Sequence, residues 1–213
     1  GVNPRGGRPE AAATLEVAMF TVPAGALLFS TLLLNANIFA IDRQGLNLLF
    51  QFSCPRRLLF LGKNVATFSL IGAVAAGLLL LIGVLTRRFD LFAISLVGTL
   101  SLMLIFLGAG NLLSVAFPHR LPSKHEPQMQ TSTGRGCLMF VVHSVAYFLV
   151  AAVATPPLLA LVLPYSLDRM TAYWMTLPAV ALYCLALYAG SVVCAGGWLQ
   201  RREPDLLQAV RGE

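Results

Sequence analysis

The sequence predicts an all-α, polytopic membrane protein with five main membrane-spanning helices. Hydrophobic residues make up 57% of the chain and charged residues only 11%, against roughly 25% charged residues in an ordinary soluble domain. The apolar residues are gathered in runs long enough to cross a hydrocarbon core, which takes about 20 helical residues. A soluble fold of this size could not bury such runs on all sides. No clean alternation of apolar and polar residues supports a β-barrel.

We expect the spans at residues 17–40, 65–86, 91–115, 137–164 and 171–199, inside a transmembrane domain that covers residues 17–200. A polar segment, residues 1–16, precedes this domain, and a tail of residues 201–213 follows it. The fourth run contains Pro156 and Pro157, and a proline has no N–H to donate within a helix. We therefore expect that span to end at Ala154 and to be followed by a short re-entrant or interfacial segment near residues 158–163.

The basic residues of the connecting regions predict the orientation of the spans. Four lie in the loop of residues 41–64, three in the loop of residues 116–136 and three in the tail, which makes ten on one side, whereas the other side has five. Because cytoplasmic loops are enriched in Lys and Arg, we expect the richer side and the C-terminus to be cytoplasmic. The N-terminal segment is then expected outside, which suggests a further span upstream in the native polypeptide.

Several classes of function are disfavoured by composition and motif content. The net charge of +6 is spread over short loops and forms no basic stripe with interleaved aromatic residues, so we expect no nucleic-acid partner. The four cysteines have no CxxC spacing, which indicates free thiols and no metal or cofactor site. Without paired carboxylates, GxSxG or HExxH, an enzyme is not expected. No acid lies in the middle of a span, which disfavours an ion-coupled carrier.

The loop of residues 41–64 is the most informative connection. Residues 45–53 fit one amphipathic helix with a polar stripe that includes Asn47 and Gln51, and Pro55 suits the first turn of the next helix. Arg56 and Arg57 follow, at the depth of lipid headgroups. The residues alone leave two interpretations equally open: an elbow that only contacts anionic lipid, or a helix that docks a partner.

A family resemblance favours the partner. The pattern Asn37, Phe39, Asp42, Gly45, Pro55, Arg56-Arg57, Leu59 and Gly62-Lys63-Asn64 resembles the first cytoplasmic loop of ABC-2 type transporter permeases. Gly110-Asn111-Leu112-Leu113-Ser114, followed by Phe117-Pro118 and Arg120, resembles the end of a later span in part of that family, and Arg201-Arg202-Glu203 is weakly similar to its tail. These motifs extend over most of the chain, and their order and spacing carry the resemblance.

The resemblance implies a role for the loop and a set of partners. The family's transmembrane domain has one span more than the five expected here, and its first cytoplasmic loop forms a coupling helix that docks an ABC ATPase subunit. Two such domains pack together in a bacterial-type cytoplasmic (inner) membrane to export a substrate. The residues that would couple to the ATPase are Asp42, Arg43, Gly45, Asn47, Gln51, Pro55, Arg56, Arg57, Gly62, Lys63 and Asn64.

ATP hydrolysis itself is expected in a separate polypeptide. Gly62-Lys63 is not part of a P-loop, because that motif requires a glycine at position 57 and Ser or Thr at position 64. We assign Gly110, Asn111, Ser114 and His143 to helix packing or to the translocation pathway, with packing favoured for Asn111. Two alternatives stay open: a membrane scaffold or assembly protein without transport, and an ion-coupled secondary transporter.

Overall fold

A computed structural model describes residues 10–36, 54–117, 133–166 and 170–211. These residues form helices α1 (Glu10–Ala36), α4 (Arg56–Thr86), α5 (Phe89–Ala116), α6 (Thr133–Ser166) and α7 (Met170–Arg211). Each of the five is long and apolar enough to cross a membrane. For the described residues, the prediction of an all-helical protein with five helices suited to crossing a membrane is therefore confirmed.

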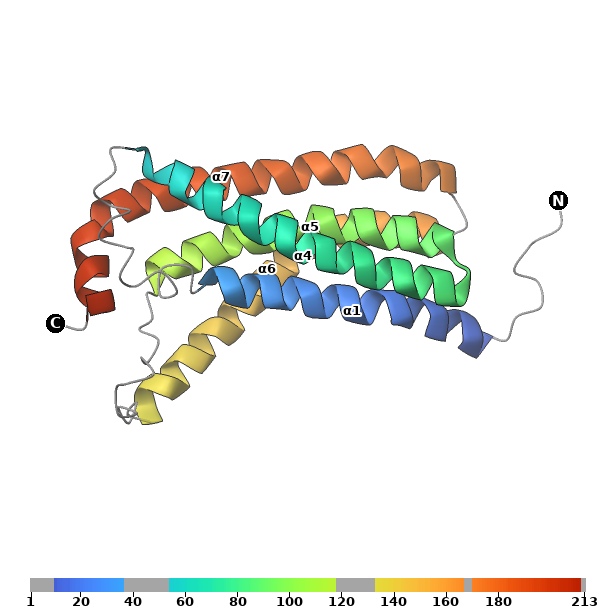
Figure 1. The fold of residues 1–213 in the computed structure, drawn as a ribbon, viewed down its shortest axis with the longest axis horizontal. Coiled ribbons are helices and arrows are strands. Elements are labelled where there is room, and N and C mark those ends of the chain that lie inside the picture. Colours follow the sequence, from blue (N-terminus) through green and yellow to red (C-terminus); the bar gives the residue numbers. More distant parts are fainter. Residues whose placement is uncertain (1–9, 37–53, 118–132, 167–169, 212–213) are drawn as a thin grey trace.

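The five helices alternate in direction along one bundle (Figure 1). α1, α5 and α7 end where α4 and α6 begin, so the three basic regions of the sequence adjoin the same end of the bundle. We call this the basic end. The other end holds the short connection between α4 and α5, where Arg87 adopts a left-handed conformation with φ of 55°. The backbone N–H of Arg87 donates to the Val84 carbonyl, and the backbone N–H of Arg88 donates to the Gly83 carbonyl. These two bonds close the C-terminus of α4.

α5 is the centre of the bundle. Of its most apolar stretch 56% is buried, compared with 28% or less for the four other helices. It packs against α1, α4, α6 and α7, and its long central cluster includes Leu102, Met103, Phe106 and Leu107. A separate cluster around Phe60, Val115 and Leu199 lies at the basic end. The side chains that face away from α5 are apolar and exposed, as lipid-facing surfaces are.

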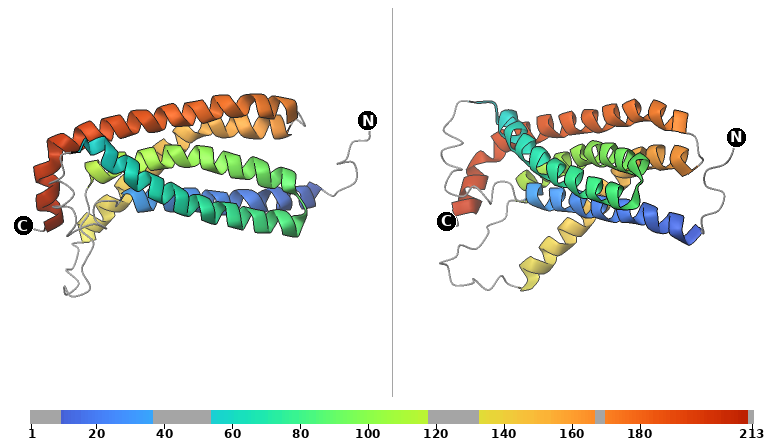
Figure 2. Two further views of the ribbon diagram at one scale, coloured as in Figure 1. Left: turned by 45° about the horizontal axis from the view of Figure 1, so that its top comes forward. Right: turned by 45° about the vertical axis from the view of Figure 1, so that its right-hand side comes forward.

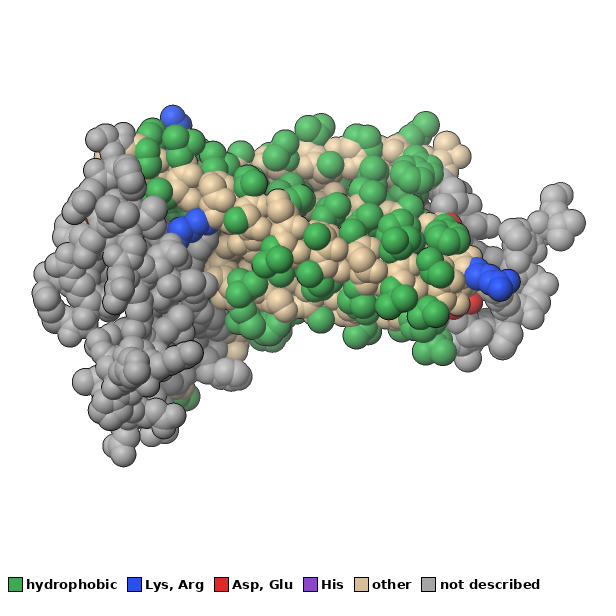
Figure 3. Space-filling model, in the orientation of Figure 1, with side chains coloured by type: hydrophobic (Ala, Val, Ile, Leu, Met, Phe, Trp, Pro, Cys, Tyr) green, Lys and Arg blue, Asp and Glu red, His purple; other side chains and the backbone are tan. Residues whose placement is uncertain are grey.

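The surface of the bundle has the layout of a membrane protein. On the face shown in Figure 3, hydrophobic side chains cover the middle of the described surface, and charged side chains gather toward its two ends. Figure 2 shows that the first half of α6 leaves the bundle at an angle, while its second half runs beside α7.

α6 corrects one expectation. The helix does not end at Ala154 but continues through Pro156, Pro157 and Pro164 to Ser166, so a separate segment after the prolines is not seen.

Hydrogen bonds from α7 replace two of the bonds that the prolines remove. A proline leaves the carbonyl four residues earlier without its helical donor. For Pro157 this is the Val153 carbonyl, which accepts a 3.2 Å hydrogen bond from the Tyr183 hydroxyl of α7. For Pro164 it is the Ala160 carbonyl, which accepts one of 3.2 Å from Thr176. Neighbouring side chains that supply such bonds let a membrane helix keep its prolines.

A second difference concerns the loop of residues 41–64. Its last nine positions belong to α4, which begins at Arg56 and continues as one helix to Thr86. Pro55 stands immediately before the helix, as its fixed φ favours. α4 extends beyond the expected start of the span because residues 58–61 are an unbroken apolar run. This run continues the apolar surface of the span toward the basic end. α7 likewise continues beyond the expected limit of the last span to Arg211, and its final turns leave the line of the helix and run across the basic end (Figure 1).

Candidate functional site

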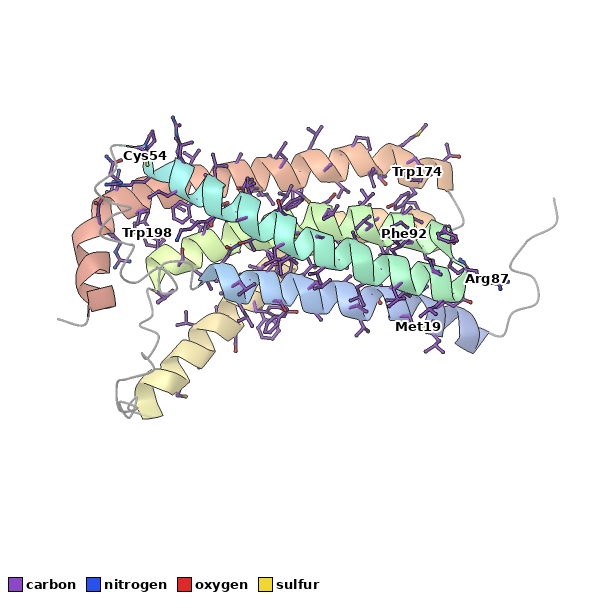
Figure 4. All side chains as sticks on the ribbon, viewed as in Figure 1. Met19, Cys54, Arg87, Phe92, Trp174 and Trp198 are labelled. Atoms are coloured by element: carbon purple, nitrogen blue, oxygen red, sulfur yellow. The ribbon has the colours of Figure 1, made fainter. Side chains whose placement is uncertain are left out.

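The candidate site lies at the basic end, where α4 begins beside the end of α7. Figure 4 shows Cys54 and Trp198 at this end, and Arg87, Phe92 and Trp174 at the other. The first turn of α4 is closed by a 2.8 Å hydrogen bond from the Leu58 N–H to the Pro55 carbonyl. The chain that precedes Cys54 belongs to the predicted coupling loop, so this turn is the point where that loop joins the spans.

An ion pair ties the first turn of α4 to α7. The Arg56 guanidinium donates two hydrogen bonds to the Glu203 carboxylate, from Nε at 3.1 Å and from Nη2 at 2.9 Å. Both side chains are largely buried, with 15% and 23% of their surfaces exposed. A two-point contact between planar groups fixes their relative orientation as well as their distance. The α4 start and the α7 end are therefore held in one geometry.

Two further contacts strengthen this junction. A Cβ atom placed on Gly196 would lie 3.0 Å from the backbone nitrogen of Arg57, so the two backbones touch where α7 has no side chain. Arg202 donates to the carbonyls of Val115 and Ala116, both at 3.4 Å, and its guanidinium carbon lies 5.6 Å from the centre of the Trp198 ring. α7 is thus attached to the start of α4 and to the end of α5 at once. We call these contacts of Arg56, Glu203, Gly196 and Arg202 the α4–α7 clamp.

Deeper in the bundle, four polar side chains from four helices form a polar layer: Asn35 of α1, Asn64 of α4, Asn111 of α5 and Tyr188 of α7. The Asn64 amide donates a 3.0 Å hydrogen bond to the Tyr188 hydroxyl. A Cβ on Gly110 would collide with the Cβ of Asn35, and a Cβ on Gly108 would lie 3.6 Å from the Cα of Tyr188. Glycine in α5 therefore lets α1 and α7 approach closely at this level.

The polar layer is incompletely paired. The three asparagines are 1% exposed or less. Within the described structure, both side-chain polar atoms of Asn35 and of Asn111, and the Oδ1 atom of Asn64, have no hydrogen-bond partner. An unpaired buried amide costs about 1–3 kcal/mol in proteins. The layer is therefore a costly feature of the packing seen here, and this cost would be relieved by any arrangement that pairs the amides.

The acids at the ends of the spans are paired at the opposite end of the bundle. Arg88 donates to both carboxylate oxygens of Asp90, at 3.0 Å and 2.9 Å, and also to Glu16 of α1. This arrangement links the start of α5 to the start of α1 and accounts for both acids as structural groups. Among the described residues, no cluster of three His, Cys, Asp or Glu side chains suited to a metal ion occurs.

The structure brings together only part of the predicted site. Asp42, Arg43, Gly45, Asn47 and Gln51 lie outside the described residues. Gly62, Lys63 and Asn64 lie in the second and third turns of α4, and Asn64 is the one that faces the core. Ser114 donates to the Asn111 carbonyl at 2.8 Å, whereas the interhelical bond expected of the Asn111 side chain is absent from the described structure. His143 is part of α6, but its side chain lies outside the described structure.

Sequence analysis assigned no site role to three members of this site, Asn35, Tyr188 and Glu203, and named Glu203 only as part of the weakly similar tail. Asn35 interrupts the end of the first apolar run, which is a signal in itself, because a polar residue inside a span usually faces other helices. Tyr188 and Glu203 give no such signal, since their importance depends on pairing with Asn64 and Arg56, which are more than a hundred positions away.

Comparisons with known proteins returned no match: no family model, no curated protein and no solved structure is similar to this chain.

Proposed function

We propose that the chain is a membrane-spanning subunit of an ATP-driven exporter of the ABC-2 type. In this proposal it forms part of the translocation pathway, and the loop of residues 41–64 docks a separate ATPase subunit. The five membrane-length helices are consistent with such a subunit. The proposal is also supported by the resemblance to the family. That resemblance rests on the order of three motifs, in the loop, at residues 110–120 and in the tail.

The α4–α7 clamp is the observation that carries the proposal. A subunit driven from outside the membrane needs a mechanical connection between its docking loop and its spans. Here Arg56, where the loop of residues 41–64 becomes helix α4, is held at two points by Glu203 of the last span. Gly196 brings the two backbones into contact one residue further along. A displacement of the loop would therefore move α4 and α7 together and not α4 alone.

This arrangement suits a two-state transport cycle. ATP binding would draw two ATPase subunits together and shift the docked loops of two transmembrane domains. The clamp would pass this shift to α4 and α7, which both pack on the central helix α5. Because packed helices switch between discrete arrangements, the ATPase would bias an equilibrium between inward-open and outward-open forms. The unpaired amides of the polar layer belong to α1, α4 and α5, and a second packing of these helices could satisfy them.

The proposal is tested by purifying the tagged chain from its native membranes and measuring ATP hydrolysis in the purified complex. We expect a co-purifying subunit with Walker A and ABC signature motifs, whose hydrolysis rate changes when the complex is placed in a bilayer. A chain that is correctly inserted but purifies without ATP-hydrolysing activity would instead favour a membrane scaffold or assembly protein.

The role of the clamp is tested by reversing its charges in that complex. We expect Arg56→Glu to uncouple ATP hydrolysis from transport, because two carboxylates would then oppose each other. The double variant R56E/E203R should restore coupling, since it rebuilds the pair with opposite polarity. If the double variant stays uncoupled while both proteins insert normally, Arg56 acts on something other than Glu203, and the clamp does not carry the movement.

A further inference from the structure

A groove opens on the surface of the bundle at the basic end, between the first turn of α4 and residues 193–200 of α7. It measures about 280 Å³ and is lined by Pro55, Arg56, Arg57, Val193, Gly196, Gly197 and Gln200. Its floor exists because α7 has two successive glycines here. Gly196 touches the Arg57 backbone, whereas a Cβ on Gly197 would meet nothing within 4 Å.

Among the described residues, Arg57 is the cation of the groove that has no counter-charge. Arg56 is neutralised by Glu203, as described above. Arg57 is exposed, and its guanidinium makes no hydrogen bond or ion pair with the described residues. The remaining polar side chain of the lining is the neutral amide of Gln200. A ligand of this groove should therefore carry a negative charge and accept hydrogen bonds from Arg57.

The position of the groove indicates where that ligand comes from. Arg56 is the first residue of a helix that is longer than a hydrocarbon core needs, so Arg57 belongs to the end of the helix that is expected among the lipid headgroups. Beside the groove, Leu58 and Val193 are 50% and 61% exposed, and such apolar surface belongs against lipid chains. A charged pocket that continues into an apolar, lipid-facing surface matches the two parts of a phospholipid.

We propose that this groove binds the headgroup of an anionic phospholipid. Arg57 forms charge-assisted hydrogen bonds with the lipid phosphate, the glycines leave room for the headgroup, and the acyl chains lie along Leu58 and Val193. The site needs no ATPase and no second protein, so it goes beyond the proposed transport function. A lipid held here would also fill the junction between α4 and α7 from the outside.

The two tryptophans of the chain, Trp174 and Trp198, allow a direct test. Trp198 follows Gly197 of the groove and is 39% exposed, whereas Trp174 lies at the opposite end (Figure 4). We would place the Trp174→Phe protein in nanodiscs and measure quenching of Trp198 fluorescence by phosphatidylglycerol or phosphatidylcholine brominated near the headgroup. Phosphatidylglycerol should be preferred by roughly fivefold, because one basic side chain contributes about 1 kcal/mol of attraction at an anionic surface.

Three variants distinguish a built site from general surface charge. Arg57→Gln should abolish the preference for phosphatidylglycerol. Arg201→Gln is the matched control, because Arg201 is an exposed arginine of the same end that does not line the groove, and it should leave the preference unchanged. Gly197→Leu keeps every charge but fills the groove, into space where no neighbour obstructs it, and it should abolish the preference as well.

The expected pattern is loss in Arg57→Gln and Gly197→Leu with retention in Arg201→Gln. Equal losses in Arg57→Gln and Arg201→Gln would show a diffuse electrostatic effect and overturn the proposal. A preference that survives Gly197→Leu would also overturn it, because the groove would then play no part. Since the readout uses the purified chain alone, none of these results depends on whether an ATPase partner exists.

Discussion

At the scale of single residues, the buried asparagines and the arginine of the clamp differ in whether their polar groups have hydrogen-bond partners. Arg56 has a nearly ideal partner in Glu203, so its burial is compensated. Asn35 and Asn111 have none for their side chains in the described structure. A buried polar side chain that is fully hydrogen-bonded stabilises one arrangement of the helices. A buried polar side chain without a partner would instead gain free energy in another arrangement that pairs it. The bundle therefore combines a rigid junction at its basic end with a polar layer that disfavours the packing it sits in.

We predict that Asn111→Leu stabilises the purified protein by about 1 kcal/mol or more, because it removes two unpaired polar atoms and keeps a side chain branched at the same carbon. The control is Asn64→Leu, which should be destabilising, since it breaks the bond to Tyr188 and leaves the hydroxyl of this half-buried side chain without that partner. Reversible unfolding in mixed micelles measures both free energies. A loss of stability in Asn111→Leu would mean that its amide has a partner in the folded protein.

The same unpaired amides bear on transport. If the polar layer is paired in a second packing of the helices, Asn111→Leu removes that gain and should hold the protein in the arrangement described here. We therefore expect this variant to be more stable but slower in substrate-stimulated ATP hydrolysis of the complex, while its ATPase subunits remain bound. An unchanged turnover would show that the layer takes no part in the cycle.

At the scale of helices, α6 and α7 form one unit. The prolines of α6 leave free carbonyls at Val153 and Ala160, and α7 supplies a hydroxyl to each, from Tyr183 and Thr176. The spacing between the two carbonyls, seven residues, equals the spacing between the two donors. For Pro157 and Pro164, the missing helical donor is thus replaced by a hydroxyl of α7, which helps α6 to continue through these prolines.

We predict that Tyr183→Phe destabilises the protein by about 0.5–1.5 kcal/mol, the usual loss for one hydrogen bond. Tyr147→Phe is the matched control: Tyr147 is also exposed on the bundle surface, and its described contacts are ring contacts with Phe29 and Phe148, so this change should be nearly neutral. In the Pro157→Ala background, residue 157 regains its N–H and Tyr183→Phe should cost less. A double-mutant cycle measures that coupling; a coupling of zero would separate the tyrosine from the proline.

The sequence predicts those features of the helices that depend on local interactions, and it fails for features that depend on contacts between helices. Runs of apolar residues suffice to predict five spans, because crossing a membrane is a requirement on composition and length. The fate of Pro157 depends on Tyr183, which lies in another helix, so the local rule that prolines end helices gives the wrong answer. Pro55 correctly indicates where the next helix begins, but the expected span starts only at residue 65, because Arg56, Arg57 and Lys63 resemble loop residues until Glu203 is seen to neutralise one of them.

At the scale of the whole molecule, the two ends of the bundle differ in how they hold charge. At one end, Arg88 is balanced by Glu16 and Asp90. The described helix ends that flank three stretches of the sequence, with ten of the fifteen Lys and Arg residues of the chain, lie at the basic end. Since the alternating helices bring these helix ends together, the charge difference between the ends of the bundle depends on the whole fold and not on one loop. It predicts which end faces the cytoplasm.

We predict that the basic end is cytoplasmic and the Arg87 end is outside. The test uses single cysteines in a protein whose four native cysteines are replaced, probed in intact cells with a membrane-impermeant maleimide. Arg87→Cys should react directly, because this connection lies at the far end of α4. Arg201→Cys should react only after the membrane is permeabilised. The reverse pattern would place the α4–α7 clamp outside the cell, where no ATPase could reach it, and would rule out the proposed coupling as well as the orientation.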